Sequence, residues 1–166
     1  MQPSETYTDQ TKMLSAVGIS KSFGNRSVLD GVDIQVVPGE VVGLLGPNGA
    51  GKPILFMIIC GLLKPDRGKI FLKGVDVSRQ PLYWRAQHGL GYLPQESSVF
   101  RNLTVEQNIL AVLERRIRAP KARKERLEKL LNEFNLSSVR RSKGASLSGG
   151  ERRRAEVARC LANDPS

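Results

Sequence analysis

GLLGPNGAGKP, residues 43–53, is the stretch that decides the fold. Its central part matches the phosphate-binding pattern Gly-x-x-x-x-Gly-Lys. The apolar run 41–45 before it predicts a buried strand, and the apolar run 54–63 after it predicts a buried helix. Glycines let successive backbone N–H groups point into one concavity, while the helix N-terminus and Lys52 add positive charge. The stretch therefore predicts a phosphate site between a strand and a helix.

Position 53 departs from this pattern. The pattern has Ser or Thr there, whose hydroxyl holds Mg²⁺, and this chain has Pro53. Proline has neither a hydroxyl nor an N–H, so a metal ligand and a phosphate donor are both missing. It also disfavours helical dihedrals at Lys52. Because proline is tolerated in a first helical turn, we expect the fold to survive and the metal-dependent chemistry of the loop to be lost.

A second motif, LSGGE at residues 147–151, lies a hundred residues downstream. Ser148 with Glu151 forms the pattern of a capping box, which opens a helix. By itself this could be an ordinary cap. The two glycines after the serine leave the first helical turn without side chains, so that a phosphate from another chain could approach the bare N–H groups.

Composition limits the other possibilities. The net charge is +10 over 166 residues, but the basic stretches 115–129 and 152–154 are mixed with Glu and Leu and lack interleaved aromatic residues. We therefore expect no nucleic-acid partner. The longest apolar run has ten residues, against roughly 20 for a membrane-spanning helix, and the N-terminus lacks the order of a secretory signal. Cys60 and Cys160 are expected to be reduced in the cytosol.

The remaining pattern predicts the order of elements. Residues 1–12 read as a disordered tail, and residues 14–37 as short strands with turns at Gly24-Asn25, Asp30-Gly31 and then Pro38-Gly39. Short strands are expected at 69–72 and 91–93, with a helix begun by Pro81 between them. Three helices follow, opened by a Thr104–Gln107 capping box, by Pro120 and by Ser148, the last stopping near 163. One face of the second helix carries Leu127, Leu130, Leu131 and Phe134.

The phosphate loop followed by Leu-Ser-Gly-Gly resembles the ABC ATPases. The resemblance implies ATP and Mg²⁺ as cofactors, sandwiched in a head-to-tail homodimer. In that dimer the signature of one chain faces the γ-phosphate held by the other, through Leu147, Ser148, Gly149, Gly150 and Glu151. It also implies that Phe23 stacks on adenine, although a core phenylalanine is the simpler interpretation, and that Gln95 senses Mg²⁺ and water. The implied nucleotide-binding set is Phe23, Gly46, Pro47, Asn48, Gly49, Ala50, Gly51, Lys52, Pro53, Ile54 and Gln95.

Residues 91–108 (GYLPQESSVFRNLTVEQN) and 147–160 (LSGGERRRAEVARC) are similar to the ATPase subunits of lipopolysaccharide export transporters. That resemblance implies a location on the cytoplasmic face of the inner membrane and transmembrane permease partners. The partners' coupling helices would enter a groove lined by Glu96, Phe100 and Arg101. Two alternatives stay open: an ATPase of the branched-chain amino acid importer type, and a non-transport ABC protein that acts on nucleic acid.

The expected fold is thus an α/β P-loop core with a β-rich N-terminal layer and a helical subdomain, incomplete at the C-terminus. We place the layer and core at 13–94, the helical subdomain at 95–148 and the signature helix at 149–163, all in a partial nucleotide-binding domain at 13–166. The family's catalytic strand and switch histidine would follow Pro165, so we assign no catalytic residue. His88, the single histidine, lies upstream of the signature and is not carried over as the switch.

Overall fold

A computed structural model describes residues 13–165, so the predicted tail at 1–12 lies outside the described residues. The chain divides into two compact units, one ending at His88 and the other beginning at Gly89. The boundaries expected from sequence at residues 94 and 148 remain predictions.

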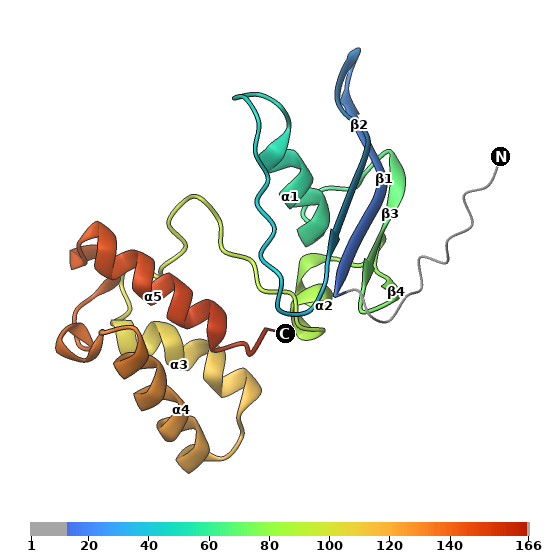
Figure 1. The fold of residues 1–166 in the computed structure, drawn as a ribbon. Helices are drawn as coiled ribbons and strands as arrows, with labels where there is room; N and C mark the ends of the chain where they lie inside the picture. The colour runs from blue at the N-terminus through green and yellow to red at the C-terminus, as the bar shows by residue number, and fades with distance from the viewer. Residues whose placement is uncertain (1–12, 166) are drawn as a thin grey trace. The chain divides into compact units, whose positions relative to one another are not determined.

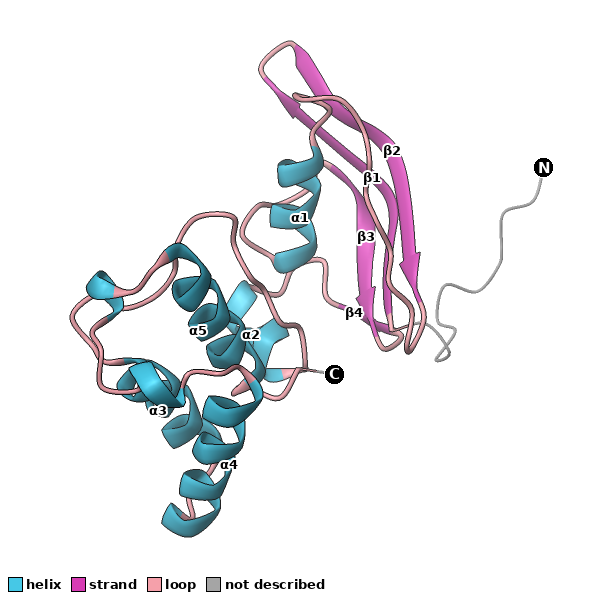
Figure 2. Ribbon diagram, turned by 60° about the vertical axis from the view of Figure 1, so that its left-hand side comes forward, coloured by secondary structure: helices cyan, strands magenta, loops and turns pink. Residues whose placement is uncertain are grey.

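The first unit is built on an antiparallel sheet (Figure 1). The strand order is β2-β1-β3-β4, with β1 (Leu14–Phe23), β2 (Arg26–Val36), β3 (Arg67–Leu72) and β4 (Val75–Asp76). Helices α1 (Lys52–Cys60) and α2 (Leu82–Gln87) complete the unit, and Figures 1 and 2 show α1 alongside one face of the sheet. The predicted turn at Gly24-Asn25, the strand at 69–72 and the helix after Pro81 are confirmed.

The prediction of a buried strand at 41–45 is wrong for the described structure. Residues 40–47 have no regular secondary structure, and Val41 and Leu45 are 96% and 92% exposed. A strand forms only when its N–H and C=O groups pair with a neighbour, and within residues 13–165 no segment pairs with this one. The expected strand at 91–93 is absent from the described structure for the same reason.

The expected turn at Asp30-Gly31 is a bulge inside β2. The register runs from Ile19 opposite Val32 to Lys21 opposite Leu29, so β2 carries one more residue than β1 over this stretch. Gly31 has φ 62° and donates its N–H to Ser20 Oγ at 3.0 Å. Glycine followed by alternating polar and apolar residues fits a bulge as well as a turn, and the partner strand decides between them.

Helix α1 is shorter than the apolar run that predicts it. It ends at Cys60 because Gly61 adopts φ 80° and returns its N–H to the Ile58 carbonyl. The expectation that the helix is buried all round is also wrong, since Phe56 and Leu62 are half exposed. Leu55, Ile58, Ile59 and Cys60 form its buried face.

One buried cation ties α2 to the end of α1. Arg85 is 1% exposed and donates to the carbonyl oxygens of Ile58 and Ile59, the former at 2.9 Å. It also donates to Gln80 O at 2.8 Å and Ser78 O at 3.3 Å. A cation at a helix C-terminus satisfies orphan carbonyls and complements the helix dipole, so Arg85 fixes where α1 ends.

The second unit is helical. It contains α3 (Val105–Arg116), α4 (Pro120–Glu133) and α5 (Gly149–Leu161), with 3₁₀ turns at Ser137–Val139 and Gly144–Ser146. The predicted apolar face of α4 is confirmed, because Leu127, Leu130 and Leu131 are buried and Phe134 is partly buried. These side chains join a core that also draws on α3 and α5, through Val105, Ile109, Leu113, Ala155, Ala158 and Ala162.

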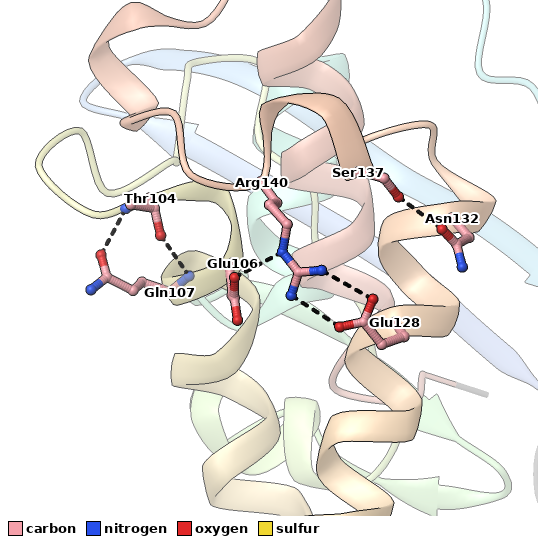
Figure 3. Close-up of polar contacts among 7 residues, drawn as sticks. All are labelled: Thr104, Glu106, Gln107, Glu128, Asn132, Ser137 and Arg140. Atoms are coloured by element: carbon pink, nitrogen blue, oxygen red, sulfur yellow. Dashed lines mark hydrogen bonds and ion pairs between the residues drawn. The ribbon is translucent and has the colours of Figure 1, made fainter.

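Polar contacts at the ends of α3 and α4 fix this arrangement (Figure 3). The capping box predicted at Thr104 is present, with reciprocal bonds of 2.9 and 3.1 Å to Gln107. Arg140 bridges the two helices, since its Nε lies 3.0 Å from Glu106 Oε2 and its second terminal nitrogen 2.9 Å from Glu128 Oε1. Because these hydrogen bonds, to Glu106 first, stabilise its charge, the pKa of Arg140 is raised.

Candidate nucleotide-binding site

The loop between residue 45 and α1 has the backbone shape that phosphate binding needs. Gly49 and Gly51 have φ 84° and 82°, a conformation that other residues adopt only with strain. At Gly51 a side chain would also collide with β2, because a Cβ atom would lie 2.8 Å from Leu29 Cδ2 and 2.9 Å from the Val28 carbonyl oxygen. Glycine at position 51 therefore lets the loop lie directly against the sheet.

Lys52 folds back over this loop. Its ammonium donates to the carbonyl oxygens of Gly46 at 2.6 Å and Pro47 at 2.7 Å. Within residues 13–165 the N–H groups of Gly49 and Gly51 make no hydrogen bond, whereas that of Ala50 closes a turn onto Pro47 O at 3.3 Å. Free amides, a helix N-terminus and an ammonium group in one loop form a site for an anion. The residues present fit a nucleotide phosphate.

The same site does not fit Mg²⁺ in the usual way. Pro53 occupies the second position of α1, where the pattern supplies a hydroxyl ligand, and offers neither a hydroxyl nor an N–H. Among residues 13–165, no three His, Cys, Asp or Glu side chains gather into a group that could hold a metal. The loop therefore keeps the groups that would bind a phosphate but lacks the hydroxyl that would bind Mg²⁺.

Phe23 ends β1 next to the hairpin turn and is 49% exposed, so it is not a core side chain. The Lys21 ammonium lies 5.6 Å from the centre of its ring. Lys21 also pairs with Asp66 at 2.7 Å, and this hydrogen bond, with a second from the Ser22 amide, lowers the pKa of Asp66. An exposed ring at this hairpin is available for stacking, and its adenine-binding role remains a prediction.

The signature motif forms the capping box predicted at Ser148. The Glu151 carboxylate accepts the Ser148 N–H at 2.8 Å and its hydroxyl at 2.7 Å, and Ser148 Oγ accepts the Glu151 N–H at 3.3 Å. The Ser148 side chain, and then its amide, lower the pKa of Glu151. A Cβ added at Gly149 would meet no atom within 4 Å. Gly149 therefore leaves open space beside the first turn of α5.

The remaining expected site residues lie on the surface of the second unit. Gln95, Glu96, Phe100 and Arg101 are all exposed. The Phe100 ring lies 4.9 Å from the guanidinium carbon of Arg159. The phosphate loop and the signature belong to different units, and each motif is described only within its own unit.

Three buried polar residues that hold loops or helix ends were not found from the sequence: Arg85, Asn108 and Glu156. Glu156 shares a stripe of α5 with Arg153 and Arg159, three residues away on either side, so its spacing does not mark it as buried. The partners are in loops, so periodicity alone does not identify them.

A glycine-rich loop that lies against a sheet at the start of a helix, with a lysine folded back over it, is the arrangement of a P-loop nucleotide-binding fold. The chain belongs to the ABC transporter family, whose sequence pattern matches residues 29–166. A crystal structure of a nucleotide-free ATP-binding cassette from an ABC transporter is similar, with a TM-score of 0.78, 30% identity and coverage of 93% of this chain and 66% of that one. A second, an ATP-binding subunit of an ABC transporter, has a TM-score of 0.80 at 29% identity, covering 92% and 63%. The expected fold class is confirmed.

Within the ABC transporter family, the chain is similar to ATP-binding proteins of lipopolysaccharide export systems. The lipopolysaccharide export system ATP-binding protein LptB of Acidithiobacillus ferridurans is 53% identical over 155 residues, covering 93% of this chain and 64% of the relative. LptB of Escherichia coli K12 is 46% identical over 153 residues, covering 92% and 64%. The chain thus spans 64% of the length of these relatives. No helix among the described residues is long and apolar enough to cross a membrane.

Proposed function

We propose that this chain is the nucleotide-binding part of the ATPase subunit of a lipopolysaccharide export transporter. The observation that carries the proposal is the loop 46–52, whose free amides and lysine form an anion site at the start of α1. Identities of 46–53% to proteins named for lipopolysaccharide export support the choice within the family. An importer-type or nucleic-acid-acting ABC protein remains the alternative.

In this proposal the loop amides and Lys52 bind the β- and γ-phosphates, and the exposed Phe23 ring stacks on adenine. The signature of a second copy, Ser148 to Gly150, approaches the γ-phosphate, so the working unit is a head-to-tail dimer. Mg²⁺, when bound, would neutralise charge on the phosphates, but Pro53 cannot help to hold it. We therefore propose nucleotide binding with little metal dependence.

Glu96, Phe100 and Arg101 form the proposed contact with transmembrane permease subunits, since all three are exposed on one loop. The chain would then lie at the cytoplasmic face of the inner membrane. Nucleic acid is not proposed as a partner, because the basic residues of α3 and α4 are not interleaved with exposed aromatic side chains.

Titration of the chain with a fluorescent ATP analogue tests the binding claim. Lys52→Ala removes the one ammonium in the loop and should weaken binding at least about tenfold, the typical effect of losing a charged hydrogen bond. Lys64→Ala is the matched control, because Lys64 is an exposed lysine elsewhere in the same unit. Equal affinities for the two variants would refute a phosphate site at this loop.

A further inference from the structure

The loop 97–103 has no regular secondary structure, yet its backbone is fixed from the α3 side. Asn108, which is 1% exposed, accepts the Phe100 N–H at 2.8 Å through Oδ1. Its Nδ2 donates to the carbonyl oxygens of Phe100 at 3.1 Å, Leu103 at 3.3 Å and Thr104 at 2.9 Å. One amide side chain therefore holds the middle and the end of the loop.

Helix α5 holds the beginning of the same loop. Glu156 is 4% exposed, and its Oε1 accepts the Ser97 hydroxyl at 2.9 Å and the Ser98 N–H at 2.8 Å. Its Oε2 accepts from Arg153 at 3.3 Å. Arg159 donates to Ser98 Oγ at 2.8 Å. Residues 153, 156 and 159 are spaced by three, so they share one stripe of the helix.

A third contact comes from the segment that leads into the signature. A Cβ atom at Gly144 would lie 2.6 Å from Val99 Cγ1 and 2.8 Å from Phe100 O, so only glycine permits this approach. The Gly144 N–H donates to Leu103 O at 2.9 Å, and the Ala145 N–H donates to Arg101 O at 2.9 Å. The loop is thus fixed on three sides, while the Phe100 ring stays 53% exposed.

Surface loops are usually mobile, and an exposed aromatic residue on a fixed backbone is instead pre-organised for contact. We propose that Glu156 is a positioning residue, whose buried carboxylate holds Ser97 and Ser98 at the start of the loop that presents Phe100 and Arg101. This inference rests on the proposed function, in which those two residues contact the transmembrane partner.

The same helix begins at the signature. Glu156 lies eight residues after the N-cap Ser148, about 12 Å along the helix at 1.5 Å per residue. Glu156 and the signature are therefore carried by the same helix. Burial by itself would raise the pKa of Glu156, but hydrogen bonds from Ser98, Ser97 and Arg153 outweigh it and lower the pKa. The carboxylate thus remains charged and able to hold the loop at neutral pH.

Hydrogen exchange of backbone amides, measured by mass spectrometry on peptides of the whole chain, tests this role. Glu156→Ala should speed exchange of the Ser98 amide, followed in the peptide covering 97–103, about tenfold, because this amide loses a charged acceptor. Exchange in α3 and α4 should remain as in the parent chain. Glu125→Ala is the matched control, since Glu125 is an exposed glutamate on α4.

Two further variants separate positioning from folding. Glu156→Gln keeps a carbonyl oxygen for Ser97 and Ser98, so it should restore most of the protection. Glu156→Asp shortens the side chain by one methylene, so it should speed amide exchange in 97–103 and nowhere else. This variant tests the positioning role if the alanine variant does not fold. The inference is overturned if exchange at 97–103 in the Ala or Asp variant matches Glu125→Ala, or if protection falls equally throughout α3–α5.

Nucleotide binding serves as the independent readout. Glu156→Ala should bind the fluorescent ATP analogue as the parent chain does, because the phosphate loop lies in the first unit. If the parent chain fails to bind nucleotide while the exchange pattern is as expected, the proposed function falls and the positioning of the loop stands. If nucleotide binds and exchange at 97–103 in the Glu156 variants equals that of the parent chain, the positioning role alone is refuted.

Discussion

Arg85→Met should destabilise the first unit by about 3 kcal/mol. The guanidinium makes four hydrogen bonds to carbonyl oxygens, of residues 58, 59, 78 and 80. Hydrogen bonds to a charged group contribute about 1.5–3 kcal/mol each. Removing the buried charge also removes its desolvation cost of several kcal/mol, which cancels much of that sum. The net loss of about 3 kcal/mol corresponds to a melting temperature lower by roughly 12–24 °C for a unit of this size.

Trp84 supplies the assay, because it is the single tryptophan of the chain and neighbours Arg85 on α2. Its ring stacks on His88 with the ring centres 3.5 Å apart, so its fluorescence should report the loss of α2 packing. Urea titration followed at this tryptophan gives the free energy of unfolding. Arg79→Met is the matched control, since Arg79 is exposed in the turn before α2. Arg85→Lys should lie between the two, because one ammonium cannot reach all four carbonyls.

A difference of less than about 0.5 kcal/mol between Arg85→Met and Arg79→Met, the usual range for surface substitutions, would refute this reasoning. It would mean that water replaces the guanidinium at the end of α1 without cost. The length of α1 would then depend on Gly61 alone.

Three other results are expected. Arg140→Ala should lower the free energy of unfolding by about 1 kcal/mol, because Arg140 is partly exposed and its ion pairs have the strength of surface pairs. This loss should shrink in 1 M NaCl, and a loss that does not change with salt would contradict an electrostatic bridge to Glu106 and Glu128. Burial raises the pKa of the Cys60 thiol to about 11, although the nearby Arg85 charge partly opposes this rise. Cys60 should therefore react with a disulfide reagent at pH 8 only when the chain unfolds. Rapid reaction in the native chain would contradict the burial of this end of α1. Glu156 has a pKa below its ordinary value of 4.5, so its contribution to stability should be present above about pH 4.5 and be lost as the pH falls through the folded value. A stability difference between the chain and Glu156→Gln that does not shrink at all as the pH is lowered below 4.5 would contradict this.

Local signals in the sequence predicted local structure well. Both capping boxes, at Thr104 and Ser148, are present because a cap and the residue three positions later are enough to fix a helix start. The apolar spacing of α4 likewise placed Leu127, Leu130 and Leu131 in the core. The phosphate loop could be located from glycine spacing, because its shape depends on backbone conformation that glycine alone adopts easily.

Features that depend on distant partners could not be predicted in the same way. The run 41–45 has strand character, but a strand forms only where another segment pairs with it. Gly31 reads equally as a turn or a bulge until the register against β1 is known. The buried roles of Arg85 and Glu156 depend on carbonyl and hydroxyl groups in loops, which periodicity does not reveal.

Calorimetric titration of ATP against the parent chain and Pro53→Thr, with Mg²⁺ and with EDTA, tests the central claim most directly. Threonine returns a backbone N–H and a hydroxyl to the loop in which we propose that the amides and Lys52 bind a phosphate. We predict measurable binding by the parent chain with little dependence on Mg²⁺, and an affinity gain for Pro53→Thr that is largest with Mg²⁺ and shrinks in EDTA. Equal affinities in all four titrations would contradict a phosphate site at this loop whose metal ligand is lost at Pro53.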